Sequence, residues 1–78
     1  MSDQKKIIEA IAENLALQVA DIDLEANLKD DLGLNPVEIS DLLDDLSQKF
    51  NILFDPAETI QVQTARDLVD MVEDKLLE

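Results

Sequence analysis

The sequence contains no cysteine, histidine, tyrosine or tryptophan. Without cysteine it cannot form a disulfide, a catalytic thiolate or a zinc–thiolate site. Without histidine it lacks the commonest general base, so no serine or threonine hydroxyl has an imidazole to activate it. No apolar run reaches the roughly 20 residues that cross a bilayer. We therefore expect a cytoplasmic protein that is not an enzyme and has no metal site.

Positive charge is also scarce. Six Lys and Arg residues stand against nineteen Asp and Glu, and the formal net charge is −13. Such a surface repels the phosphates of nucleic acids and of anionic membranes, so neither is expected as a partner. The basic surface of a partner protein or enzyme is its natural complement. Alone, the chain is expected to be a monomer.

Apolar residues make up 46% of the chain, and they recur at helical spacing in three segments. These run from about residue 3 to 17, from 36 to 50 and from 64 onward. Between the first two, residues 18–34 form a long connection with a short helical turn expected at 28–32. Gly33, the only glycine, is expected in a conformation that other residues avoid. A further short helix is expected to begin at Pro56. The pattern thus predicts that residues 1–78 form one domain. This domain is expected to be a small all-α four-helix bundle with three main helices, one short helix and a long first loop.

The middle segment has the clearest helix start. Asn35 suits the N-cap, and Pro36 suits the first helical position, where no amide bond is lost. Glu38 stands where it can complete a capping box. Thr64 and Asp67 repeat a weaker form of the same signal before the last segment. The sequence therefore predicts helices that open at residues 36 and 65.

The middle segment also has an acidic face opposite its apolar stripe. Carboxylates repeat there at spacings of three and four residues, and two more stand at the end of the preceding loop. The six residues are Asp30, Asp31, Glu38, Asp41, Asp44 and Asp45. Most charge runs are only solvated faces, but Lys49 alone offsets this one. We interpret the face as a docking surface for a basic partner.

The loop invites a calcium interpretation, because four side chains with oxygen ligands alternate from Asp21 to Asn27. An EF-hand would need glycine in place of Ala26 and glutamate in place of Leu32. Both positions are wrong for that motif. We expect no dedicated calcium site, with loose binding of divalent cations as the milder alternative.

The segment Asp31-Leu32-Gly33-Leu34-Asn35-Pro36-Val37 resembles the acyl carrier proteins, which carry Asp-Leu-Gly-x-Asp-Ser-Leu there. The likeness continues through residues 38–54 and 64–70, and it covers essentially the whole chain. It implies a carrier fold with three main helices and one short helix. In working carriers a transferase attaches phosphopantetheine from coenzyme A to the serine that opens the second helix. The acyl chain rides on that arm, and basic patches of enzymes dock on the acidic helix.

This chain departs from the pattern at the attachment serine. Pro36 occupies that position and has no hydroxyl, and Asn35 and Val37 replace its usual Asp and Leu neighbours. Ser40 and Asp44 stand where partner enzymes often touch apolar residues. Ser40 is a poor substitute for attachment, because it lies about 6 Å further along the helix and is held in helical geometry. No cofactor is expected unless this second serine carries phosphopantetheine.

We therefore interpret the chain as an acyl-carrier-like protein that has lost the arm and acts as an acidic docking module. One alternative is a carrier in fatty-acid or related acyl metabolism, with the acyl group held at Ser40 or non-covalently. Another is an acidic mimic that blocks a nucleic-acid-binding protein.

Overall fold

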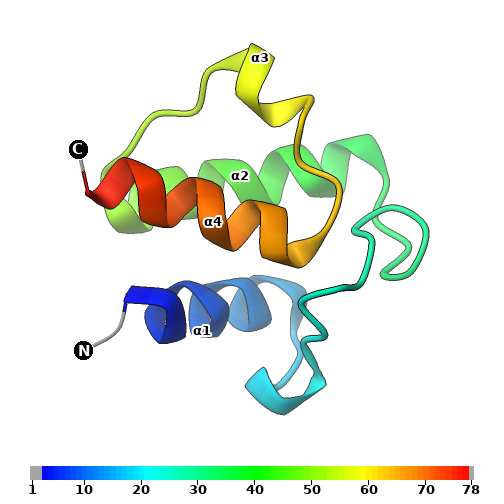
Figure 1. Cartoon of the computed structure of the whole chain (residues 1–78). Coiled ribbons are helices and arrows are strands. Elements are labelled where there is room, and N and C mark those ends of the chain that lie inside the picture. Colours follow the sequence, from blue (N-terminus) through cyan, green and yellow to red (C-terminus); the bar gives the residue numbers. More distant parts are fainter. Residues whose placement is uncertain (1–2, 78) are drawn as a thin grey trace.

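The computed structural model describes residues 3–77, and these form a bundle of helices. Its elements are α1 (Asp3–Leu15), a 3₁₀ turn η1 (Val19–Asp21), α2 (Pro36–Phe50), α3 (Pro56–Thr59) and α4 (Ala65–Leu76). α1, α2 and α4 are the long helices of the bundle, and the single turn of α3 lies to one side of them (Figure 1). The described residues contain no strand, so the expected all-α bundle is confirmed.

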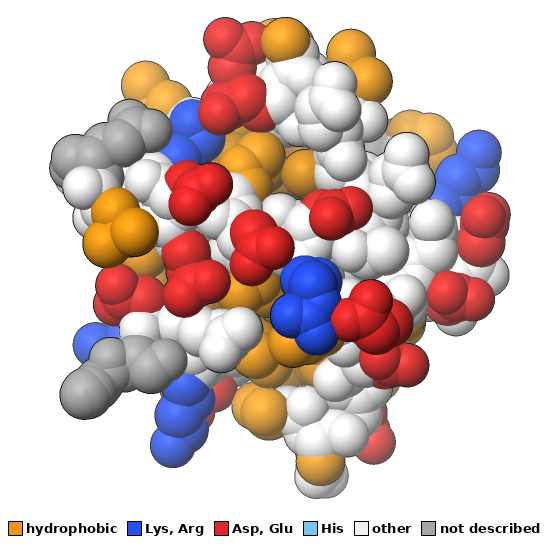
Figure 2. All heavy atoms as spheres, viewed as in Figure 1, with side chains coloured by type: hydrophobic (Ala, Val, Ile, Leu, Met, Phe, Trp, Pro, Cys, Tyr) orange, Lys and Arg blue, Asp and Glu red, His pale blue; other side chains and the backbone are white. Residues whose placement is uncertain are grey.

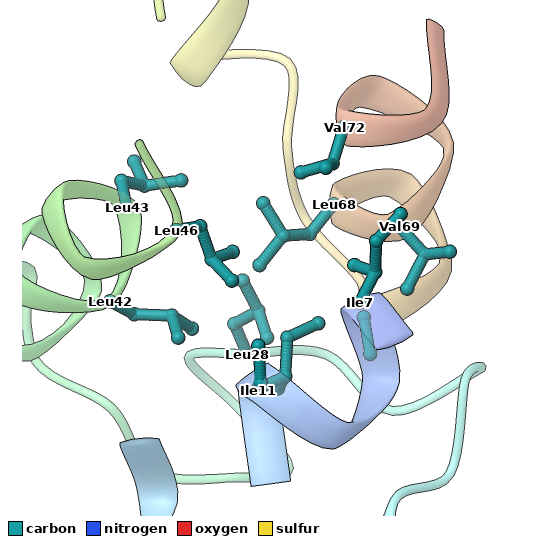
Figure 3. Close-up of a cluster of buried hydrophobic side chains, with 11 residues drawn as sticks. Ile7, Ile11, Leu28, Leu42, Leu43, Leu46, Leu68, Val69 and Val72 are labelled. Carbon is teal, nitrogen blue, oxygen red and sulfur yellow. The ribbon is translucent and has the colours of Figure 1, made fainter. Parts of the chain in front are cut away.

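The three long helices close around one apolar core. Side chains from α1, α2 and α4 point toward one another there, and Leu28 of the first loop joins them (Figure 3). The most completely buried are Ile7, Ile11, Leu28, Leu42, Leu46, Leu68, Val69 and Val72. Within each helix these residues are one, three or four positions apart, which places them on one face. Burial of these apolar faces is the main force that holds the bundle together.

α2 begins as its sequence predicts. The side chain of Asn35 accepts a hydrogen bond from the N–H of Glu38 at 2.8 Å, and the Glu38 carboxylate accepts one from the N–H of Asn35 at 2.9 Å. Pro36 occupies the first helical position between them. Thr64 and Asp67 form the same reciprocal box before α4, with both bonds at 3.1 Å. These caps fix where the loops end and the helices begin.

α1 ends two residues before the expected residue 17. Ala16 adopts a left-handed backbone conformation with φ of 59°. The N–H of Leu17 then bonds the carbonyl of Ala12, and the N–H of Ala16 bonds that of Glu13. This is the Schellman arrangement, which glycine usually closes. Because alanine stands at the closing position, the sequence carried no stop signal there.

The short turn expected at residues 28–32 forms, but it does not continue into a helix. It is organised by Asn27, whose side-chain oxygen accepts the N–H groups of Lys29 and Asp30 at 2.9 Å. The carbonyl of Asn27 accepts the N–H groups of Asp31 and Leu32. The side chain of Asn27 thus caps this turn in the way that an N-cap residue caps a helix. The short helix of this loop is η1, which the sequence did not predict.

The long loop is held against the start of α4 by its backbone. The N–H groups of Ala65 and Arg66 donate to the carbonyls of Ala26 and Leu24, at 3.0 and 2.8 Å. These are first-turn donors that a helix cannot satisfy itself. Leu28, only 2% exposed, anchors the same stretch in the core. The loop therefore acts as a fixed part of the bundle and brings residues 30–35 to the start of α2.

Candidate functional site

The start of α2 forms an exposed tip where the long loop meets the helix. Gly33, with φ of 70°, turns the chain toward it. Pro36 and Val37 are both exposed, and Val37 retains 77% of its accessible surface. Single exposed apolar residues are common on protein surfaces, so Val37 alone does not define a site. The tip is a candidate contact surface because Pro36 and Val37 stand beside exposed carboxylates there.

The six acidic residues predicted as a docking surface differ in what they do. Asp31 accepts the N–H of Asn27, and Glu38 is engaged in the capping box. Within residues 3–77, Asp30, Asp41 and Asp44 are exposed and accept no hydrogen bond or ion pair. Their carboxylates are available to a partner without breaking an internal interaction.

Asp45, the sixth residue, lies in the seam between α1 and α2. It accepts a hydrogen bond from the Asn14 side chain at 3.3 Å and forms an ion pair with Lys49 at 3.8 Å. Lys49 also bonds Glu13 of α1 at 2.7 Å, and this hydrogen bond holds the pKa of the Glu13 carboxyl below its ordinary value. Asp45 thus helps to join two helices, and its charge is partly neutralised by Lys49.

Negative charge is not confined to α2. Figure 2 shows Asp and Glu side chains spread over the face on which α4 lies nearest the viewer, with few Lys or Arg among them. On α4, Asp67, Asp70 and Asp74 are exposed. The acidic field therefore surrounds much of the molecule and does not by itself single out α2. What distinguishes α2 is the combination of unpaired carboxylates with exposed apolar residues at its start.

An apolar groove of about 580 Å³ lies between α2 and the α3 segment, and the sequence did not predict it. Its apolar lining includes Ile39, Leu43, Leu53, Phe54, Ile60 and Val62. Pro36 and Ser40 also line it, so the α2 tip opens onto the groove. Leu53 and Ile60 are 84% and 77% exposed, a sign that this apolar surface is incompletely covered. Asp44 is the one charged residue among the described residues that line the groove, and no Lys or Arg is among them.

An ion pair joins α3, one wall of that groove, to α4. Lys75 bonds Glu58 at 2.7 Å, and the lysine side chain is only 15% exposed. Glu58 also accepts the N–H of Asp55 at 2.9 Å, which caps α3. The bonds from Lys75 and from the backbone of Asp55 hold the pKa of the Glu58 carboxyl below its ordinary value. A four-residue helix has little stability of its own, so this pair helps to fix its position.

A Glu58→Gln variant is therefore expected to be less stable than the parent at neutral pH. Glutamine keeps an oxygen for the N–H of Asp55 but removes the charge that attracts Lys75. Because the pKa of Glu58 is lower in the fold, its contribution is complete above the unfolded value of about 4.3 and is lost as the pH falls through the folded value. Thermal unfolding of both proteins from neutral to about pH 3 should show the difference shrinking. A difference that is unchanged by acid would contradict this role of the ion pair.

Two further findings bear on the class of protein. No helix in the described part of the chain is long and apolar enough to cross a membrane. Within residues 3–77 no group of three or more acidic side chains is placed to hold a metal ion. Of the alternating carboxylates of the loop, Asp23 accepts the N–H of Glu25 at 2.9 Å, and Glu25 pairs with Arg66 of α4 at 2.7 Å.

Sequence comparison identifies the class. Residues 5–72 match the family model described as "Phosphopantetheine attachment site". An acyl carrier protein of Exiguobacterium sp. (strain AT1b) is 37% identical over 68 residues, which cover 87% of this chain and 86% of that protein. The acyl carrier protein of Thermotoga maritima is 32% identical over 71 residues, which cover 91% and 88%.

The fold agrees with these relatives. The solution structure of the apo doublet acyl carrier protein from prodigiosin biosynthesis matches 92% of this chain with a TM-score of 0.74 and 19% identity. The match spans 35% of that longer chain. A small helical bundle with a long first loop and a phosphopantetheine-type family match defines a carrier domain. The chain belongs to the acyl carrier protein family.

Proposed function

We propose that this chain is an acyl-carrier-like protein that works without phosphopantetheine, as an acidic module that docks on the basic surface of a partner protein. The observation that carries the proposal is Pro36 at the first position of α2. In this proposal Pro36 stands where the family's attachment serine would be. A proline has no hydroxyl, so no phosphodiester to the arm can form on it.

The capping geometry supports the loss of the arm. Asn35, Pro36 and Glu38 together form a complete capping box with proline at the first helical position. Proline is favoured there because its φ is already set and its missing N–H would have had no intrahelical partner. A site freed from the need for a serine hydroxyl can adopt this more stable start.

The unpaired carboxylates support the docking role. Asp41 and Asp44 are exposed on α2 and Asp30 is exposed at the loop end, with no internal partner to satisfy them. We assign Asp31, Glu38 and Asp45 to the same surface as contributors to its field. Exposed ion pairs contribute under about 1 kcal/mol each, so their main effect is on the rate and orientation of association. The partner is accordingly a protein with a Lys- and Arg-rich face.

A second candidate function is favoured by the groove between α2 and α3. Its apolar volume suits an acyl chain, attached at Ser40 or held non-covalently. A free fatty acid suits the groove less well, because Asp44 would repel its carboxylate. Asp44 is the one charged residue among those described along the groove. Lipid that co-purifies with the protein, detected by mass spectrometry after extraction, would favour this function over the docking module.

The docking role is tested by capturing proteins from a lysate of the source cells on the immobilised chain at low salt. An Asp41→Asn/Asp44→Asn variant is expected to lose most of the bound protein, since the unpaired carboxylates of α2 are removed. Captured proteins should elute as salt is raised, because exposed charge pairs are screened. Captured nucleic-acid-binding proteins that are displaced by added DNA or RNA would instead favour the acidic mimic.

The matched control is Asp70→Asn/Asp74→Asn on α4. It removes the same amount of charge from residues that are also exposed, so it is expected to retain the captured proteins. If the two double variants lose binding equally, the interaction follows the overall charge and α2 is not the docking surface. Binding that persists unchanged at high salt would contradict an electrostatic module altogether.

A further inference from the structure

The groove between α2 and the α3 segment combines an apolar recess with apolar projections on one face of the molecule. Its walls include Ile39 and Phe54, which are half-buried and pack against the core. Its lining also includes Leu53 and Ile60, which are 84% and 77% exposed. Isolated exposed apolar residues are common, but two of them beside one apolar recess form a patch of the kind that marks a contact site.

This face is nearly uncharged, although the whole chain carries a net charge of −13. Asp44 is the one charge among the described residues that line the groove. On the adjoining α3 segment, Asp55 is engaged in the helix cap and Glu58 pairs with Lys75 at 2.7 Å. A basic partner therefore finds little unpaired negative charge here, whereas two copies of this chain meet little repulsion on this face.

We propose that this groove is a self-association surface, on which a second copy of the chain packs about a twofold axis. In such an isologous pair each copy presents the same patch, so the patch must complement itself. The groove meets this condition, because Leu53 and Ile60 of one copy fill the recess of the other while their counterparts fill its own. A free fatty acid is less suitable, because its carboxylate would lie beside Asp44.

The size of the face indicates a weak, reversible dimer. Twelve residues line the groove, whereas a stable interface engages about 20–30 residues on each side. At low salt the like net charges keep the copies apart, so the chain is expected to be a monomer there. Added salt screens this repulsion and leaves the apolar contact in place. Self-association is thus expected to strengthen with salt, whereas docking on a basic partner weakens.

Self-association also bears on the proposed docking surface. Asp44 lines the groove and is one of the unpaired carboxylates assigned to docking. A dimer that covers the groove therefore covers Asp44, together with Pro36 and Ser40 at the start of α2. The two interactions compete for the same helix. The inference goes beyond the proposed function and adds a control of it that depends on protein concentration.

Sedimentation equilibrium of the purified chain tests the proposal, with interference optics because the chain has no tyrosine or tryptophan. Protein is varied from about 10 μM to about 1 mM, at about 0.01 M and about 0.3 M salt. The dissociation constant of the dimer is expected to fall about tenfold at the higher salt. Leu53→Ser/Ile60→Ser is expected to raise it by at least about tenfold, because aliphatic contacts across the twofold axis are lost.

The matched control is Val37→Ser/Leu77→Ser. It makes the same kind of change at residues that are 77% and 81% exposed but do not line the groove, and it is expected to leave the dissociation constant unchanged. Circular dichroism verifies that both double variants remain folded.

Asp44→Asn gives a second measurement that does not depend on the apolar variants. It removes the one charge from the described lining of the groove, so it is expected to lower the dissociation constant of the dimer several-fold. Asp70→Asn on α4 removes the same charge outside the groove and is expected to have a smaller effect. An Asp44→Asn variant that dimerises no better than Asp70→Asn would place the contact elsewhere and overturn the proposal.

The remaining outcomes are equally decisive. A chain that stays monomeric at every concentration and at both salts would overturn the proposal, as would a dimer that dissociates when salt is added. Equal loss of association in the two double variants would also overturn it, and so would co-purified lipid that keeps the chain monomeric. A monomeric chain that still captures proteins from a lysate at low salt would overturn this inference alone and leave the proposed function standing.

Discussion

A Leu46→Ala variant is expected to lose about 3 kcal/mol of its free energy of unfolding. Leu46 is fully buried on α2, where it packs against side chains from α1 and α4 (Figure 3). Truncation removes apolar contact and leaves a cavity that rigid helices fill only in part. Small domains have only about 5–10 kcal/mol in total, so the variant should be unfolded at markedly lower urea concentration. Urea titration followed by circular dichroism measures this change.

Leu53→Ala is the matched control for this prediction. It makes the same change of side chain at a residue that is 84% exposed, and it should alter the free energy of unfolding by less than about 0.5 kcal/mol. Equal losses in the two variants would mean that the core does not lie where α1, α2 and α4 meet. The docking surface would then lack the rigid support that the proposal assumes.

A Pro36→Ser variant is expected to gain one phosphopantetheine when incubated with coenzyme A and a broad-specificity phosphopantetheinyl transferase. The substitution supplies a hydroxyl at the exposed first position of α2, and Asn35 and Glu38 still cap the helix around it. Intact-mass spectrometry distinguishes the modified chain from the bare one. The expected change is from no detectable product to nearly complete modification, since the transferase needs a hydroxyl on which to act.

Adding Ser40→Ala to the Pro36→Ser variant is the control for the site of attachment. The double variant should be modified as fully as the single one if the new serine carries the arm. Modification that disappears with Ser40→Ala would assign the attachment to Ser40, and the second candidate function would replace the docking module. If neither variant is modified, the surface that this transferase recognises has diverged together with the serine position.

The helices were predictable because their signals are local. The stripes of buried residues and the two capping boxes lie within a few positions of one another, so α2 and the start of α4 fall where the sequence predicts. The end of α1 was not predictable, because Ala16 closes it in a conformation that glycine usually adopts. The short turn at residues 28–32 was predictable from the spacing of Leu28 and Leu32, but its cap, the side chain of Asn27, was not predicted.

The candidate site was predicted only in its charges. The sequence placed Asp41 and Asp44 on one exposed face, but it did not show that Asp45 is engaged with Asn14 and Lys49 across the seam. The apolar groove between α2 and the α3 segment depends on side chains brought together from several elements. Such surfaces have no local signature, because their residues are apolar like those of the core and differ only in how much of them the fold leaves uncovered.

The central claim is that the chain acts without a phosphopantetheine arm. The most direct test is the intact mass of the unaltered protein, purified from cells with an active phosphopantetheinyl transferase and then incubated with coenzyme A and the broad-specificity enzyme. We predict the mass of the bare chain in both samples. A gain of one phosphopantetheine in either sample would contradict the claim, and mapping of the modified peptide would then begin at Ser40.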